Sequence, residues 1–119
     1  MKQFTAEANL NRTDRVIVAS EVLVTVVRQA ALEVPGVTGL APVAGGVNRL
    51  LRRGKADGVV IEVSDQIATV QLHLRVAADC DMHVVSRNVQ AEVARSMNKI
   101  VGLTVASVDV FVDDVEFNA

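Results

Sequence analysis

Aromatic residues are nearly absent from this chain of 119 residues, which contains three Phe and neither Trp nor Tyr. A hydrophobic core must therefore be built from Val, Leu, Ile and Ala. Half of the residues are apolar, and the length is that of one ordinary domain, so the chain has enough material for such a core. We expect a single domain over residues 14–117, preceded by a flexible arm of residues 1–13, which are polar and show no periodic pattern.

Cysteine and long apolar runs are also scarce. The single cysteine, Cys80, excludes an intramolecular disulfide framework and suits a reducing compartment. No apolar run approaches the roughly 20 residues that a membrane helix needs. Residues 1–7 lack the long apolar core of a signal peptide. These absences favour a cytoplasmic protein with no direct membrane span.

Charge is small in total but unevenly distributed. The net charge of −2 does not indicate a strong polyanion binder. Between Val34 and Ala56 there are four basic residues and no acidic ones, whereas after Ile100 there are four acidic residues and no basic ones. The basic residues are Arg49, Arg52, Arg53 and Lys55, and the acidic ones are Asp109, Asp113, Asp114 and Glu116. Such asymmetry suits self-association or an anionic partner.

Helical periodicity predicts two main helices. In the first, Ser20 is the expected N-cap, and Pro35 with Gly36 ends the helix. Asp81 is the expected cap of the second helix, which Gly102 ends. Apolar stripes at helical spacing are expected to be buried: Val22, Leu23, Val26, Val27, Ala30, Ala31 and Val34 in the first, and Val85, Val89, Val93, Met97 and Ile100 in the second. A further short helix is expected over residues 47–53.

Strands are predicted at residues 15–18, 59–63, 67–78 and 104–112, with a hairpin turn at 64–66. In the third strand Val70, Leu72, Leu74 and Val76 alternate with Gln71, His73 and Arg75, which indicates one buried face. In the last strand Ala106, Val108, Val110 and Val112 should face the core, and the alternation slips at Asp113 and Asp114, which indicates a bulge. The predicted fold is α+β and two-layered, with a mostly antiparallel sheet of about four strands, two main helices on one face, and β-α-β-β-α-β order.

No arrangement of reactive residues indicates catalysis. A general base at His73 would need an orienting partner and a pocket. Asp79, Cys80, Asp81 and His83 include metal-ligand types, but the second ligand pair of a zinc site is missing. The acidic residues of the last strand are better explained as protection of a sheet edge. We expect no enzyme, no catalytic residues, no metal and no cofactor.

The basic cluster of Arg49, Arg52, Arg53 and Lys55 is the one candidate partner-binding patch. Lipid head groups, nucleic acid and an acidic protein surface are all compatible with it, as is a simple solvated face. Nucleic-acid readers usually add aromatic residues for base stacking, and none lies nearby, so nucleic acid is not the expected partner. Gly45 and Gly46 precede it without the phosphate-loop pattern, because no Ser or Thr follows Lys55.

Several segments together resemble one family. Residues 16–22, the Val-x-Gly-Val-x-Gly turn within residues 31–40, and the strand at 58–63 resemble, in order, the alkaline-shock-protein family of envelope-stress-response proteins. So do the Arg87-Asn88-Val89-Gln90 run of the second helix and the closing strand at 102–115. The resemblance covers nearly the whole chain, from about Arg15 to Phe117.

The resemblance implies a non-enzymatic protein of cell-envelope stress response and homeostasis. Members of the family act through protein–protein contacts, are held at the membrane by an integral-membrane partner, and tend to self-associate. For this chain we therefore expect a scaffold or interaction protein that forms homo-oligomers and lies in the cytoplasm, peripheral to the inner face of the cell membrane. The alternative is a nucleic-acid-binding or regulatory module that uses the basic loop at residues 49–55.

Overall fold

The computed structural model describes residues 3–6, 16–42 and 58–117. The elements, in chain order, are β1 (Gln3–Ala6), β2 (Val16–Ala19), α1 (Ser20–Leu32), β3 (Val37–Leu40), β4 (Val59–Ser64), β5 (Ile67–Ala77), α2 (Met82–Ser96), the π-helical turn η2 (Met97–Val101) and β6 (Thr104–Glu116). The short helix expected over residues 47–53 lies outside the described residues.

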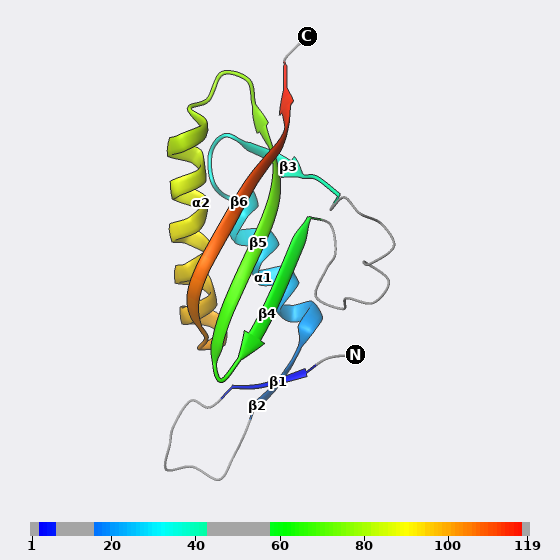
Figure 1. Cartoon of the computed structure of the whole chain (residues 1–119), viewed down its shortest axis with the longest axis vertical. Helices are drawn as coiled ribbons and strands as arrows, with labels where there is room; N and C mark the ends of the chain where they lie inside the picture. The colour runs from blue at the N-terminus through cyan, green and yellow to red at the C-terminus, as the bar shows by residue number, and fades with distance from the viewer. Residues whose placement is uncertain (1–2, 7–15, 43–57, 118–119) are drawn as a thin grey trace.

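Strand β5 is the centre of a four-stranded sheet. It pairs in parallel with β6 along its whole length on one edge. On the other edge it pairs antiparallel first with β4 and then with β3 (Figure 1). Parallel pairing requires a crossover, which α2 supplies between β5 and β6. The predicted class, α+β with a mostly antiparallel sheet, is therefore confirmed.

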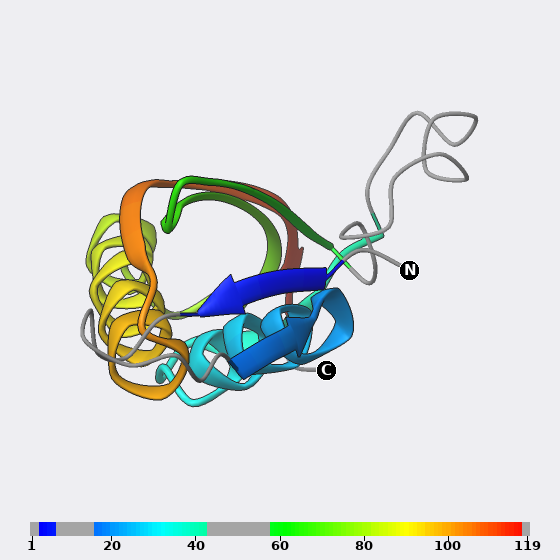
Figure 2. The same cartoon turned by 90° about the horizontal axis from the view of Figure 1, so that it is seen from below.

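Alternation along β5 produces the buried face that the sequence predicts. Val70, Leu72, Leu74 and Val76 are each at most 1% exposed, whereas Gln71 between them is exposed. Helices α1 and α2 lie side by side against this apolar face (Figure 2). The opposite face of the sheet carries no helix within the described part of the chain. It is therefore the face on which the polar side chains of β5 lie.

The fourth strand of this sheet is not the one that the sequence suggested. The strand expected at residues 15–18 forms as β2, but it pairs with β1 in a separate two-stranded sheet. Its place in the main sheet is taken by β3, which lies outside the strands predicted from the sequence. Because β1 lies within residues 1–13, four residues of the expected arm form a strand.

Helix α1 starts at Ser20, one residue earlier than predicted, so its cap is one residue earlier as well. Ala19 is the N-cap, no side chain caps the helix, and Ser20 lies inside the first turn with only 3% exposure. The prediction of Ser20 as N-cap is wrong because β2 runs directly into the helix. The buried face is rotated accordingly, so that Val24 is buried and Val22 is 46% exposed.

The exit from α1 depends on Gly36, as predicted. Its φ of +99° is a left-handed conformation that side chains disfavour. A Cβ atom at this position would lie 2.7 Å from Val85 Cγ2 and 3.3 Å from Cys80 Cβ. Gly36 therefore serves both the turn into β3 and the close approach of this turn to α2.

Helix α2 begins as predicted, and Gly102 ends the helical segment as predicted, in a left-handed conformation, but the last turn before it is π-helical. The Asp81 carboxylate accepts hydrogen bonds from the backbone N–H groups of His83 (2.9 Å) and Val84 (3.3 Å). At the other end, η2 has the wider i→i+5 turn, so each residue rotates less about the helix axis. Val101, at 9% exposure, therefore occupies the core position, and Ile100 is 66% exposed. The expected burial of Ile100 is wrong.

Strand β6 contains two register shifts against β5. One leaves Asp113 without a partner in the ladder, between the pairs Leu74–Val112 and Arg75–Asp114, and confirms the predicted bulge. The other falls at Ala106 and was not foreseen. Because the pattern is displaced there, Val105 packs against the core and Ala106 is exposed, contrary to its expected inward orientation.

Candidate functional site

The open face of the sheet holds His73 in a defined environment. Its Nδ1 lies 2.8 Å from Asp113 Oδ2, and its ring stacks on Phe111 with centroids 4.7 Å apart. The imidazole is only 15% exposed. A carboxylate partner of the kind that a general base requires is therefore present. The neighbouring hollow on this face is lined by other residues, among them Glu62, Gln71 and Asp109, so His73 does not face it. This geometry supports a structural role for His73, whose contacts with Asp113 and Phe111 hold the bulge of β6 in place.

Arg75 extends the same polar row. Its guanidinium lies 3.5 Å from Asp114 Oδ2 and 3.7 Å from Glu116 Oε2. Both carboxylates are about half exposed, and ion pairs of this kind contribute little to stability. The two carboxylates therefore neutralise the charge of Arg75 on β5. Because there are two of them and one guanidinium, a net negative charge remains near the end of β6.

The segment at residues 79–83 is used structurally. Asp81 is occupied by capping α2, and Cys80 is half-buried with its Cβ close to Gly36. Across the residues that the structure describes, no group of three or more His, Cys, Asp or Glu side chains could hold a metal ion. The predicted partner patch of Arg49, Arg52, Arg53 and Lys55 lies outside the described residues and stays a prediction.

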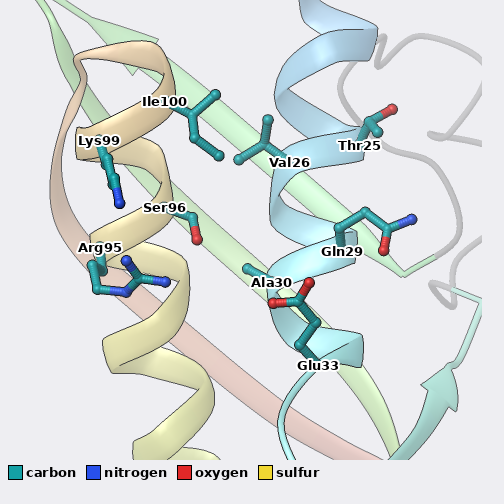
Figure 3. A pocket seen from close by; sticks show the side chains of 9 residues that line it. All are labelled: Thr25, Val26, Gln29, Ala30, Glu33, Arg95, Ser96, Lys99 and Ile100. Carbon is teal, nitrogen blue, oxygen red and sulfur yellow. The ribbon is translucent and has the colours of Figure 1, made fainter.

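A groove between the two helices is the candidate site that the sequence did not reveal. It has a volume of about 340 Å³ and lies between the middle of α1 and the end of α2 with η2 (Figure 3). Val26, Ala30 and Ile100 make its apolar part. The remaining lining residues are Thr25, Gln29, Glu33, Arg95, Ser96 and Lys99. Such a groove is suited to an apolar side chain that carries a charged neighbour.

The two walls of this groove differ in charge. Helix α2 and η2 contribute Arg95 and Lys99, while α1 contributes uncharged side chains and is followed by Glu33 at one end of the groove (Figure 3). Arg95 donates to the Glu92 carboxylate, which lowers the pKa of Glu92 and raises that of Arg95. Lys99 forms no ion pair with any described residue. Among the described residues, the wall on the α2 side therefore has one positive side chain, Lys99, that pairs with no carboxylate.

The groove could have been only partly foreseen. Arg95 and Lys99 are four residues apart, which places them on one side of a helix, and Val22, Val26 and Gln29 have similar helical spacing. The exposure of Ile100 depends on the π-helical turn, for which the sequence gives no simple signal. Without Ile100 the apolar part of the groove could not be recognised.

No helix within the described ranges is long and apolar enough to cross a lipid bilayer.

Comparison with protein families gives one match over nearly the whole chain. The model of the alkaline shock protein 23 family, described as having a cell envelope-related function, matches residues 8–117. The uncharacterised protein Spy1614 of Streptococcus pyogenes serotype M6 is 30% identical over 112 residues, which are 90% of this chain and 93% of that protein. The uncharacterised protein YloU of Bacillus subtilis is 26% identical over 102 residues, which are 82% and 85% of the two chains.

Solved structures of MamM CTD variants share the fold. A manganese form has a TM-score of 0.55 and 20% identity, and covers 81% of this chain and 99% of that one. A zinc form has a TM-score of 0.53 and 20% identity, and covers 83% and 86%. At this level of identity the similarity extends to the fold alone.

Proposed function

Because the chain belongs to the alkaline shock protein 23 family, whose function is related to the cell envelope, we propose that it is a non-enzymatic interaction protein of the envelope stress response. It acts through protein–protein contacts, as a scaffold at the inner face of the cell membrane. An integral-membrane protein anchors it there, and copies of the chain associate with one another.

The family match over residues 8–117 is the observation that carries this proposal. The distribution of exposed groups supports it. The open sheet face, the acidic end of β6 and the groove between the helices present three surfaces of different chemistry, and several large apolar side chains are exposed beside them, among them Ile100, Phe111 and Phe117. Surfaces that combine apolar and charged groups favour protein contacts.

Membrane fractionation with affinity capture tests the proposal. A tagged copy is expressed at its native level, the membranes are pelleted, and proteins crosslinked to the chain are identified. The proposal predicts that the chain pellets with membranes together with one integral-membrane protein, and that deletion of this partner moves the chain to the supernatant. A chain that stays in the supernatant and captures no envelope protein would contradict it.

The alternative of nucleic-acid binding has a test of its own. Steep salt-dependent binding of RNA or DNA, lost when Arg49, Arg52, Arg53 and Lys55 are changed to Ala, would favour a nucleic-acid-binding module instead. A variant with Arg87 and Arg28 changed to Ala is the matched control, since it removes basic residues elsewhere on the chain.

A further inference from the structure

The far end of β6 presents an unusual combination of exposed groups. Phe117 follows the last residue of the strand and is 80% exposed. Glu116 lies immediately before it and Asp114 three residues before it, and both carboxylates share the guanidinium of Arg75 and stay about half exposed. An exposed aromatic ring can bury a large apolar area in a contact, and the carboxylates beside it can pair with a positive side chain of the partner surface.

The groove between α1 and α2 has the complementary chemistry. Its apolar part, formed by Val26, Ala30 and Ile100, offers a place for an aromatic ring. Lys99 stands beside Ile100 and has no ion-pair partner in the described part of the chain. A ring seated on Ile100 would therefore bring an adjacent carboxylate to a positive side chain that is free to receive it.

One molecule cannot make this contact with itself. Strand β6 has 13 residues and begins just after η2, where the groove lies. At about 3.3 Å per residue the strand carries Phe117 roughly 40 Å from its start. Figure 1 shows β6 running along the long axis of the molecule, with its two ends far apart on that axis.

We propose that the groove between α1 and α2 binds the end of β6 of a second copy, with Phe117 on Val26, Ala30 and Ile100, and with Glu116 or Asp114 facing Lys99. This inference rests on the self-association included in the proposed function and names the surfaces that carry it. Because the two surfaces differ, the contact is heterologous, and successive copies add head to tail. Each contact is small, so association depends strongly on protein concentration.

Sedimentation of purified variants tests this contact. Ile100→Glu removes the apolar seat and Phe117→Ala removes the ring. Each change is expected to raise the concentration at half-association roughly tenfold or more. Both side chains are largely exposed, so the variants should fold, which thermal unfolding verifies. Phe111→Ala, a change of an exposed Phe on the same strand, and Arg87→Glu, a charge reversal on α2 away from the groove, are controls that should associate as the parent chain does.

Mixing the two variants is the decisive experiment. In a head-to-tail contact, Ile100→Glu retains its strand end and Phe117→Ala retains its groove. Each variant alone stays monomeric, whereas an equimolar mixture forms a 1:1 dimer and nothing larger. A mixture that stays monomeric, or variants that associate as the parent chain does, would overturn the inference.

Failure of this contact and failure of the proposed function are distinguishable. The mixing experiment uses only purified chain, whereas membrane capture reads the anchoring partner in the cell. A parent chain that is monomeric at every accessible concentration overturns the head-to-tail contact and leaves the capture result as the test of the envelope role.

Discussion

Gly36 lies where the turn after the first helix packs against the second helix, and the packing there leaves little room for a side chain. Replacement by Ala combines a left-handed backbone with a contact of 2.7 Å to Val85 Cγ2. We predict that Gly36→Ala lowers the free energy of unfolding by about 3 kcal/mol, as the sum of backbone strain and overpacking. Urea denaturation measures this loss.

Gly102→Ala is the matched control for this prediction. Gly102 has a similar φ of +86°, but a Cβ atom there would meet nothing within 4 Å. Only the strain of the left-handed backbone remains, so the free energy of unfolding should fall by about 1 kcal/mol. Equal losses at the two positions would contradict a role of Gly36 in the contact between the turn and α2.

Glu92 gives a prediction of pH dependence. The hydrogen bond from Arg95 lowers the pKa of Glu92, so the folded chain holds this carboxylate ionised at a pH where the unfolded chain begins to protonate it. Its contribution to stability is present above the unfolded pKa and is lost as the pH falls through the folded pKa. NMR titration should place the Glu92 pKa below the ordinary glutamate value, and Arg95→Ala should return it to that value. An unchanged pKa in Arg95→Ala would disprove this cause.

At the scale of single elements, η2 decides which residue completes the core. Because the π-helical turn buries Val101 and exposes Ile100, the two positions should respond oppositely to truncation. We predict that Val101→Ala costs about 2 kcal/mol of unfolding free energy and that Ile100→Ala costs less than about 0.5 kcal/mol. Thermal or urea unfolding measures both. A larger loss at Ile100 would mean that the helix continues as an α-helix through this segment.

Helix and strand periodicity predicted most of the elements, because strong local signals agree with the packing. The alternation in β5, the Asp81 cap and the bulge at Asp113 depend on residues close together in the chain, and all three are confirmed. The errors at Ser20, Val22 and Ile100 have another origin. Each follows from a shift of one residue, set by how a neighbouring segment enters or leaves the helix, and such shifts have no local signal.

At the scale of the whole molecule, the order of strands in the sheet and the candidate site were the hardest features to predict from the sequence. The sequence indicates strands but not which of them pair, so β2 was expected in the sheet that β3 joins. The groove likewise requires α1 and η2 to be brought together from distant parts of the chain. The candidate patch chosen from charge alone, Arg49 to Lys55, is separate from this groove in the sequence. Its contribution stays a prediction.

We propose that this chain works through protein contacts at the cell envelope. Photo-crosslinking in living cells tests it most directly, with the reactive residue placed at Gln29 in the groove, at Gln71 on the open sheet face, or at Arg87 on α2 away from the groove. We predict discrete adducts in the membrane fraction, containing a second copy of the chain when the reactive residue is at Gln29, and an integral-membrane protein from at least one position. A chain that forms no protein adduct from any position and is absent from the membrane fraction would contradict this role at the envelope.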